Sequence, residues 1–185
     1  MTPTKAHFPL FDNIILWRHA QAELADFELG EQDNARQLTA KGHAQAKRMG
    51  RWLKEHLPKQ TILLCSPAVR AVQTAETLHY KIQLDSALLP SATLSEVLNA
   101  LAPYQRQKNI LIVGHQPWLG ELLAYLFEQK AVDVANVQSI SVKKGAVWWL
   151  RLHSSNISSN DTSSLNTLLQ KDFYKLYTLQ TPSLL

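Results

Sequence analysis

Short apolar runs alternate with amphipathic stretches along most of this chain. Unbroken runs at 13–17, 61–65 and 109–113 are typical of strands buried on both faces of a parallel sheet. Between them, apolar residues recur at helical spacing and predict helices over 38–57, 66–79, 95–102 and 119–127. In the second of these helices, Ser66 is expected as the N-cap and Pro67 as the first helical residue. A fourth strand is expected within 82–89.

The last third of the chain has a different pattern. Segments 137–142, 146–152 and 172–179 predict three more strands, and the Ser/Asn-rich tract at about 154–164 predicts a flexible loop. We therefore expect an α/β fold: a three-layer sandwich with a mostly parallel sheet, helices on both faces and antiparallel C-terminal strands. A length of 185 residues fits a single domain spanning 1–185.

Composition narrows the possible functions. With 45% hydrophobic and 18% charged residues the chain has the composition of a globular protein. The formal charge of +4 comes from scattered basic residues without a basic run, which argues against a nucleic-acid partner but fits a small anionic substrate. The single cysteine, Cys65, excludes an intramolecular disulfide. No secretory signal pattern and no apolar run near the ~20 residues of a membrane span is present, so we expect a cytoplasmic protein with no membrane partner.

Basic side chains follow three of the predicted strands. Arg18 and His19 end the first apolar run, Arg70 lies one helical turn beyond the second, and His115 follows Gly114 after the third. In open α/β sheets ligands bind at the carboxyl ends of the strands, so these residues are expected to face one crevice.

Two arginines and two histidines suit a phosphoryl substrate, because guanidinium groups bind phosphate oxygens in pairs. An arginine in the first turn of a helix is disfavoured by the dipole, so Arg70 indicates an anion nearby. Taken singly, such an arginine is more often a solvated surface group and such a histidine more often a structural residue; their conjunction favours the site. The other histidines are interpreted as surface or packing residues, and no Cys/His cluster predicts a metal.

With these residues assembled, the sequence resembles the histidine phosphatase superfamily, which has the phosphoglycerate-mutase-like fold. The hallmark Arg-His-Gly stands here as Arg18-His19-Ala20, and small SixA-type phosphohistidine phosphatases often tolerate that alanine. The resemblance continues through "LTAKGHAQA", "SPAVRAVQTAE" and "GHQPWLG", in the family's order, up to about residue 150.

The resemblance implies a role for each matching residue and requires no metal or organic cofactor. His19 would be the nucleophile that becomes phosphorylated, Arg18 and Arg70 would hold phosphate oxygens, and His115 would donate to the phosphoryl group. His19 must be neutral to attack, so its other ring nitrogen is expected to donate to a backbone carbonyl.

One departure from the family narrows the expected substrate. Many members that cleave phosphate esters supply a Glu or Asp that protonates the leaving alkoxide, whereas the corresponding region here reads "LLPSATLSEVLNAL". Ser91 and Thr93 cannot act as that acid, and Glu96 is expected in the following helix rather than as the acid. Phosphohistidine leaves as an imidazole that solvent can protonate, so a phosphorylated protein, such as a histidine-phosphorylated signalling protein, is the favoured substrate.

Other functions are also compatible with parts of the sequence. The segment from Cys65 to Arg70 resembles a cysteine phosphatase loop, but it has four intervening residues instead of five, and Pro67 removes an amide from the cradle. A broad small-molecule phosphomonoesterase of the same superfamily is the nearest alternative, and mutase activity would need further substrate contacts. The non-enzymatic alternative is a module that binds phosphoproteins or anions without turning them over.

Overall fold

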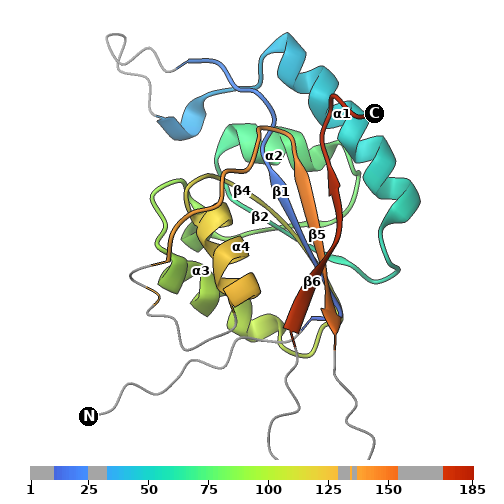
Figure 1. Cartoon of the computed structure of the whole chain (residues 1–185). Helices are drawn as coiled ribbons and strands as arrows, with labels where there is room; N and C mark the ends of the chain where they lie inside the picture. The colour runs from blue at the N-terminus through green and yellow to red at the C-terminus, as the bar shows by residue number, and fades with distance from the viewer. Residues whose placement is uncertain (1–10, 25–32, 129–133, 135–136, 154–172) are drawn as a thin grey trace, which may run out of the picture.

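A computed structural model describes residues 11–24, 33–128, 134, 137–153 and 173–185. The predicted flexible loop at about 154–164 lies outside these ranges. In Figure 1 the strands form one twisted sheet in the middle of the molecule, with α1 and α2 on one side and α3 and α4 on the other. The predicted three-layer α/β sandwich is confirmed.

Six strands form the sheet, in the order β3-β2-β4-β1-β5-β6. The parallel part consists of β1 (Asn13–Arg18), β2 (Ile62–Cys65), β3 (Ile82–Leu84) and β4 (Asn109–Gly114). The antiparallel part consists of β5 (Val147–His153), which pairs with β1, and β6 (Phe173–Gln180), which pairs with β5. The predicted antiparallel addition at the C-terminus is therefore correct.

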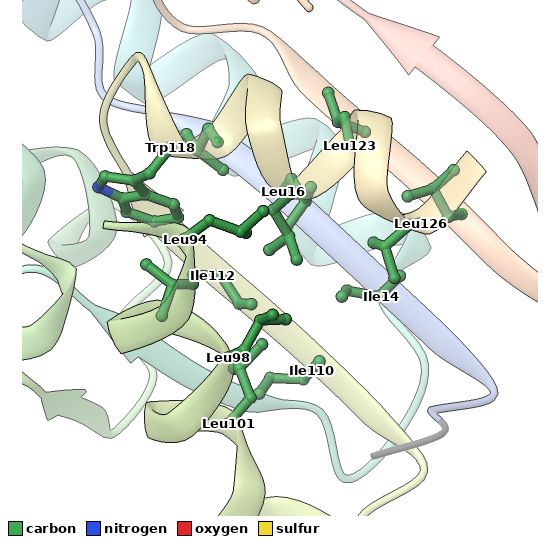
Figure 2. Close-up of a cluster of buried hydrophobic side chains, with 14 of the residues drawn as sticks. Ile14, Leu16, Leu94, Leu98, Leu101, Ile110, Ile112, Trp118, Leu123 and Leu126 are labelled. Carbon is green, nitrogen blue, oxygen red and sulfur yellow. The ribbon is translucent and has the colours of Figure 1, made fainter. Parts of the chain in front are cut away.

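Alternate residues of the central strands pack into two separate cores. Ile14 and Leu16 of β1 face a cluster that includes residues of α3 (Leu94–Leu101) and α4 (Trp118–Glu128), as Figure 2 shows. Ile15 and Trp17 face the opposite cluster, which includes residues of α1 (Ala40–His56) and α2 (Val69–Glu76). Because both faces of the strand are covered, its sequence is apolar without alternation. The buried sheet holds the strand ends in fixed positions.

Local capping confirms two of the predicted helices. Thr39 caps α1, because its side chain accepts a hydrogen bond from the amide of Gly42. Thr93 caps α3 and forms a reciprocal pair with Glu96. Threonine oxygens satisfy first-turn amides that have no partner inside the helix.

The structure corrects the predicted start of α2. The helix begins at Val69 with Ala68 as its N-cap, and no side chain caps it. Ser66 lies outside the helix, where its hydroxyl accepts a 3.3 Å hydrogen bond from the amide of Ala68 and contacts His115. The prediction that Ser66 caps the helix and Pro67 opens it was wrong, because that hydroxyl serves the turn between strand and helix.

Two predicted strands also differ. The strand expected within 82–89 is only Ile82–Leu84, and a 3-10 turn follows at Ser86–Leu88. The segment 137–142 forms no strand. Its carbonyls serve as acceptors instead, with Ile140 oxygen bonded by the Gln116 side chain and Val142 oxygen bonded by Arg18. A segment with the residue types of a strand therefore forms a connecting loop, because side chains and the Gly120 carbonyl, and not a neighbouring strand, are its hydrogen-bond partners.

Candidate active site

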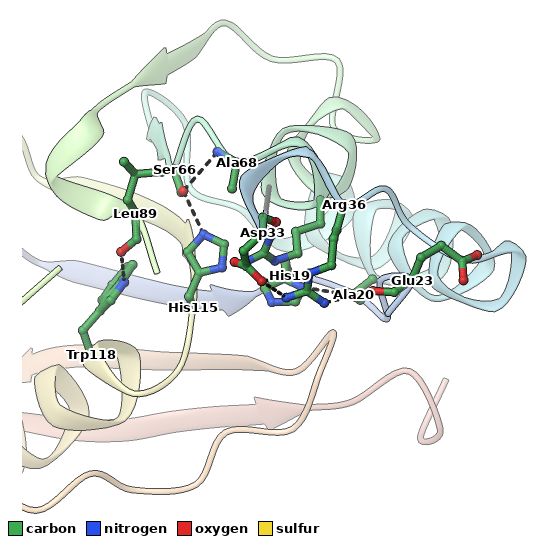
Figure 3. A network of polar contacts seen from close by, with 11 residues as sticks. His19, Ala20, Glu23, Asp33, Arg36, Ser66, Ala68, Leu89, His115 and Trp118 are labelled. Carbon is green, nitrogen blue, oxygen red and sulfur yellow. Dashed lines mark hydrogen bonds and ion pairs between the residues drawn. The ribbon is translucent and has the colours of Figure 1, made fainter. Parts of the chain in front are cut away.

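The carboxyl ends of β1, β2 and β4 lie level with one another. Arg18 pairs with Gly114, and Cys65 pairs with Val113 in the neighbouring ladder. The residues that follow these strands therefore meet at one edge of the sheet. Figure 3 shows His19 and His115 in this place, and their ring centroids are 5.0 Å apart.

His19 is buried and its ring is held in one orientation. Nδ1 lies 2.7 Å from the carbonyl oxygen of Ala20. A carbonyl only accepts, so Nδ1 carries the proton and Nε2 of the neutral ring has the free electron pair. Burial lowers the pKa of His19 to about 3, and the charges of Arg70, Arg18 and Lys144 add to this against the opposing hydrogen bond. The ring therefore stays neutral at ordinary pH.

The backbone around His19 is tied to its neighbours on both sides. The amide of Ala20 donates to the Thr74 hydroxyl at 3.1 Å, and that hydroxyl donates to the Arg70 carbonyl at 2.7 Å. From the other side, the amide of Gly145 donates to the carbonyls of Arg18 and His19. Gly145 has φ of 74°, a conformation that glycine adopts without strain. Its tight turn brings this amide over the end of β1.

Arg18 ends β1 beneath the same turn. One terminal nitrogen of its guanidinium donates to the carbonyl of Val142, while Nε is buried without a partner among the described residues. Burial lowers the pKa of Arg18. The guanidinium therefore has one arm anchored to the loop and one buried donor without an acceptor.

Arg70 is held by an acid that the sequence analysis did not single out. Both terminal nitrogens of Arg70 bind Asp33, one at the backbone oxygen and one at Oδ2, 2.7 Å away. Asp33 lies in a short 3-10 turn (Asp33–Ala35) and also pairs with Arg36. The anion that Arg70 meets is thus a carboxylate of this chain, and Nε of Arg70 stays buried without a partner in the described part of the chain.

Asp33 is ionised in this environment. Burial by itself would raise the pKa of its carboxyl, but hydrogen bonds and charges from Arg70 and Arg36 outweigh it, so the pKa is lowered. A carboxylate between two arginines can orient them. It has no proton to donate near neutral pH.

His115 pairs with Ser66, which follows β2. Its Nε2 lies 2.8 Å from the Ser66 hydroxyl, and its Nδ1 is buried without a partner among the described residues. Burial lowers the pKa of His115 to about 2, with His19 and Arg70 adding to the effect. A neutral ring has one N–H. If the Ser66 hydroxyl donates to Nε2, the N–H is at Nδ1.

Three buried nitrogens at this sheet edge therefore lack acceptors in the part of the chain that the structure describes: Arg18 Nε, Arg70 Nε and His115 Nδ1. A buried polar group without a partner is costly, of the order of 1–3 kcal/mol, so such groups are rare and indicate a ligand. The ligand that suits donors on cationic and imidazole groups is an oxyanion.

Two other residues considered in the sequence analysis, Glu96 and Cys65, have different roles. Glu96 Oε2 accepts from the amide of Thr93 at 2.7 Å and from its hydroxyl at 2.8 Å, and these bonds lower the pKa of Glu96. The thiol of Cys65 is fully buried, and burial raises its pKa well above the usual range. Glu96 is therefore a capping residue, and Cys65 is a poor source of thiolate.

The described residues contain no group of three or more His, Cys, Asp or Glu side chains close enough to hold a metal ion. Within the same ranges, no helix is both long and apolar enough to cross a bilayer.

Sequence and structure comparisons assign the chain to a protein family. The family model for the histidine phosphatase superfamily (branch 1) matches residues 14–96. A phosphohistidine phosphatase SixA homolog from Haemophilus influenzae is 32% identical over 133 residues, which cover 64% of this chain and 79% of the relative. Phosphohistidine phosphatase SixA from Escherichia coli is 30% identical over 122 residues, covering 61% and 73%.

A solved structure of a protein histidine phosphatase SixA complexed with tungstate has a similar fold. Its TM-score is 0.67 at 20% identity, over 92% of this chain and 97% of that one. The chain belongs to the histidine phosphatase superfamily, and its named relatives place it in the SixA branch. It is a phosphatase by this membership.

Proposed function

We propose that this chain removes phosphate from protein phosphohistidine through a phosphorylated His19. The observation that carries the proposal is the His19 ring: Nδ1 is committed to the Ala20 carbonyl and the pKa is held at about 3. Nε2 is then an unprotonated nucleophile next to donors that lack acceptors. Two relatives that are 30% and 32% identical carry phosphohistidine phosphatase names, which supports the same substrate here.

The reaction needs two displacements. In the first, His19 Nε2 attacks phosphorus, the bond between phosphorus and the substrate imidazole breaks, and that imidazole leaves with a proton from solvent. In the second, water attacks the phosphorus, its proton passes to solvent, and His19 recovers its electron pair as inorganic phosphate departs. Both steps pass through a loose, metaphosphate-like transition state in which the charge is spread over the phosphoryl oxygens.

The neighbouring cations and His115 have a common role in this scheme. Arg18, Arg70 and His115 donate to the phosphoryl oxygens, because a preorganised donor set stabilises developing charge without reorganising. Arg70 can do so through Nε, or through its terminal nitrogens when phosphate displaces the Asp33 carboxylate. No metal or organic cofactor takes part.

The substrate assignment depends on the acids near the site. Glu96 is occupied by Thr93, and Asp33 is occupied by Arg70 and Arg36, and the pKa of each carboxyl is lowered. Neither is suited to protonate an alkoxide leaving group, which would need a proton in the transition state. Imidazole does not need an enzyme acid, so phosphohistidine is favoured over an alkyl phosphate.

A substrate comparison tests this. A peptide phosphorylated on histidine and the same peptide phosphorylated on serine are compared by phosphate release, on the wild type and on His19→Ala. The expected kcat/KM is about 100-fold or more higher for phosphohistidine, since a general acid contributes on the order of that factor for an ester. His19→Ala should turn over neither peptide, whereas the exposed His153→Ala serves as the matched control. Faster cleavage of phosphoserine would favour the monoesterase alternative, and binding without any phosphate release would favour the non-catalytic module.

A further inference from the structure

An open groove lies between α1 and α2, outside the cluster around His19. Its cavity volume is about 540 Å³. Its lining residues are all polar or charged, with three Lys or Arg among them: His43, Lys47, Arg51, Lys54, Gln73, Glu76, Thr77 and His79. We call it the basic groove.

The basic side of the groove is a stripe on one helix. His43, Lys47 and Arg51 follow each other at intervals of four residues on α1, and Lys54 continues the row; all four are exposed. Residues four apart lie on the same helix face. The opposite face of α1 is buried and includes Met49 and Leu53. At 1.5 Å per residue the stripe is about 16 Å long.

The charge of the whole chain is concentrated on this helix. α1 carries five of the 19 Lys and Arg residues and one of the 15 Asp and Glu residues, so its five cations less one carboxylate give +4, equal to the chain's formal net charge. The rest of the chain is balanced. Like charges four residues apart repel each other. Among the described residues no ion pair within 4.0 Å neutralises Lys47, Arg51 or Lys54.

The groove begins beside the candidate active site. Gln73, which lines it, is three residues after Arg70 on α2, and its side-chain oxygen accepts a 2.8 Å hydrogen bond from the amide of Leu38. Further along, the Thr77 hydroxyl contacts the Ala46 carbonyl, so α2 follows α1 away from the site. A molecule that presents a phosphoryl group to His19 can therefore extend along the stripe.

We propose that the basic groove binds an acidic segment of the phosphoprotein substrate, and this rests on the function proposed above. The occupant is a polypeptide whose carboxylates match the row of cations over about three helical turns. Positively charged side chains of the bound polypeptide contact Glu76, the one acidic residue in the lining. Complementary charge of this kind increases the rate of encounter and fixes the orientation of the bound partner.

Three probes, two of them peptides of matched length, test the groove. The first is a 20-residue peptide with one phosphohistidine and four glutamates at helical spacing, the second has glutamine at those four positions, and the third is free phosphohistidine. The proteins are the wild type, the groove variant Lys47→Gln/Arg51→Gln/Lys54→Gln, and the control variant Lys59→Gln/Arg106→Gln/Lys108→Gln. The control removes the same charge from exposed residues near the amino ends of β2 and β4.

The wild type and the control variant are expected to prefer the glutamate peptide about tenfold in kcat/KM at low salt, because several exposed ion pairs, each weak by itself, add up where salt screens them least. In the groove variant that preference should disappear through a higher KM, with kcat and the turnover of free phosphohistidine unchanged. Equal preference in the groove and control variants, or no preference in the wild type, would overturn the proposal.

Binding of the unphosphorylated glutamate peptide is measured by fluorescence anisotropy, and this measurement separates the groove proposal from the proposed function. If the wild type cleaves none of the three substrates, the function fails while the anisotropy still tests the groove. Tighter binding of a single-stranded oligonucleotide than of the peptide, lost in the groove variant, would assign the groove to nucleic acid and contradict an acidic protein partner.

Discussion

The Ser66 hydroxyl sets which nitrogen of His115 bears hydrogen. It lies 2.8 Å from His115 Nε2 and accepts from the amide of Ala68. With that amide as its donor, the hydroxyl is free to give its own hydrogen to the imidazole, which leaves the N–H at Nδ1. Nδ1 is the buried nitrogen without an acceptor. Ser66 is in this sense a positioning residue for the donor that meets phosphate.

Replacing Ser66 with alanine should weaken phosphoryl transfer without preventing folding. Without the hydroxyl, the His115 ring can carry its hydrogen at either nitrogen, so kcat is expected to fall about tenfold, less than the loss of a whole oxyanion donor. The change should leave KM nearly constant, and the exposed Ser91→Ala is the control. Nitrogen NMR of the imidazole provides the direct readout: the wild type should show the Nδ1–H form. An Nε2–H form in the wild type would contradict this assignment.

The residues predicted from the sequence and those that were missed differ in where they lie relative to the strands. Arg18, His19 and His115 could be predicted because each directly follows an apolar run, and parallel strands bring their ends together. Asp33 could not be predicted in this way, since its partner Arg70 is 37 residues away and nothing local indicates the contact. The same holds for Thr74 and Ala20, which are 54 residues apart.

At the scale of elements, the strands were predicted well where burial on both faces decided the pattern. β1, β2 and β4 fall within a residue or so of the expected ranges, because a central strand must be apolar at every position. The segment 137–142 shows the limit of pattern alone. Its valines and isoleucine are residues typical of a strand, but the hydrogen bonds of its carbonyls go to Arg18 and Gln116, and tertiary structure supplies these partners.

The contact at Gly114, the last residue of β4, shows a second limit of prediction from sequence. A side chain at Gly114 would place its Cβ 2.1 Å from the Trp118 ring, so the close packing of β4 against the start of α4 requires glycine. The sequence showed the glycine and the tryptophan four residues apart but not their contact. Similarly, the basic stripe on α1 is scattered in sequence and becomes continuous only on the helix.

At the scale of the whole molecule, two buried imidazoles make stability depend on pH. The pKa values of His19 and His115 are lowered to about 3 and about 2, while the ordinary value is 6.5. Below pH 6.5 the unfolded chain therefore binds protons that the folded chain does not. The stability linked to these neutral rings is fully present above pH 6.5 and is lost as the pH falls from 6.5 toward 3.

This linkage predicts the result of urea unfolding at pH 7, 6 and 5. Each buried ring should raise the unfolding equilibrium constant by up to about tenfold per pH unit below 6.5. The His115→Gln variant removes one such group, so its free energy of unfolding should fall less steeply between pH 6 and 5 than that of the wild type. An identical slope in the two proteins would show that His115 is protonated in the folded state.

Under the proposed function, His19 becomes phosphorylated within a pocket of two arginines and a second histidine. The most direct measurement is rapid quench of the enzyme in alkali after mixing with a ³²P-labelled phosphohistidine peptide, followed by mapping of the labelled residue. Label is expected on His19, where it forms and decays at the rate of turnover, with none in His19→Ala and normal labelling in His153→Ala. Label on Cys65 or on another residue, or full turnover by His19→Ala, would contradict this mechanism.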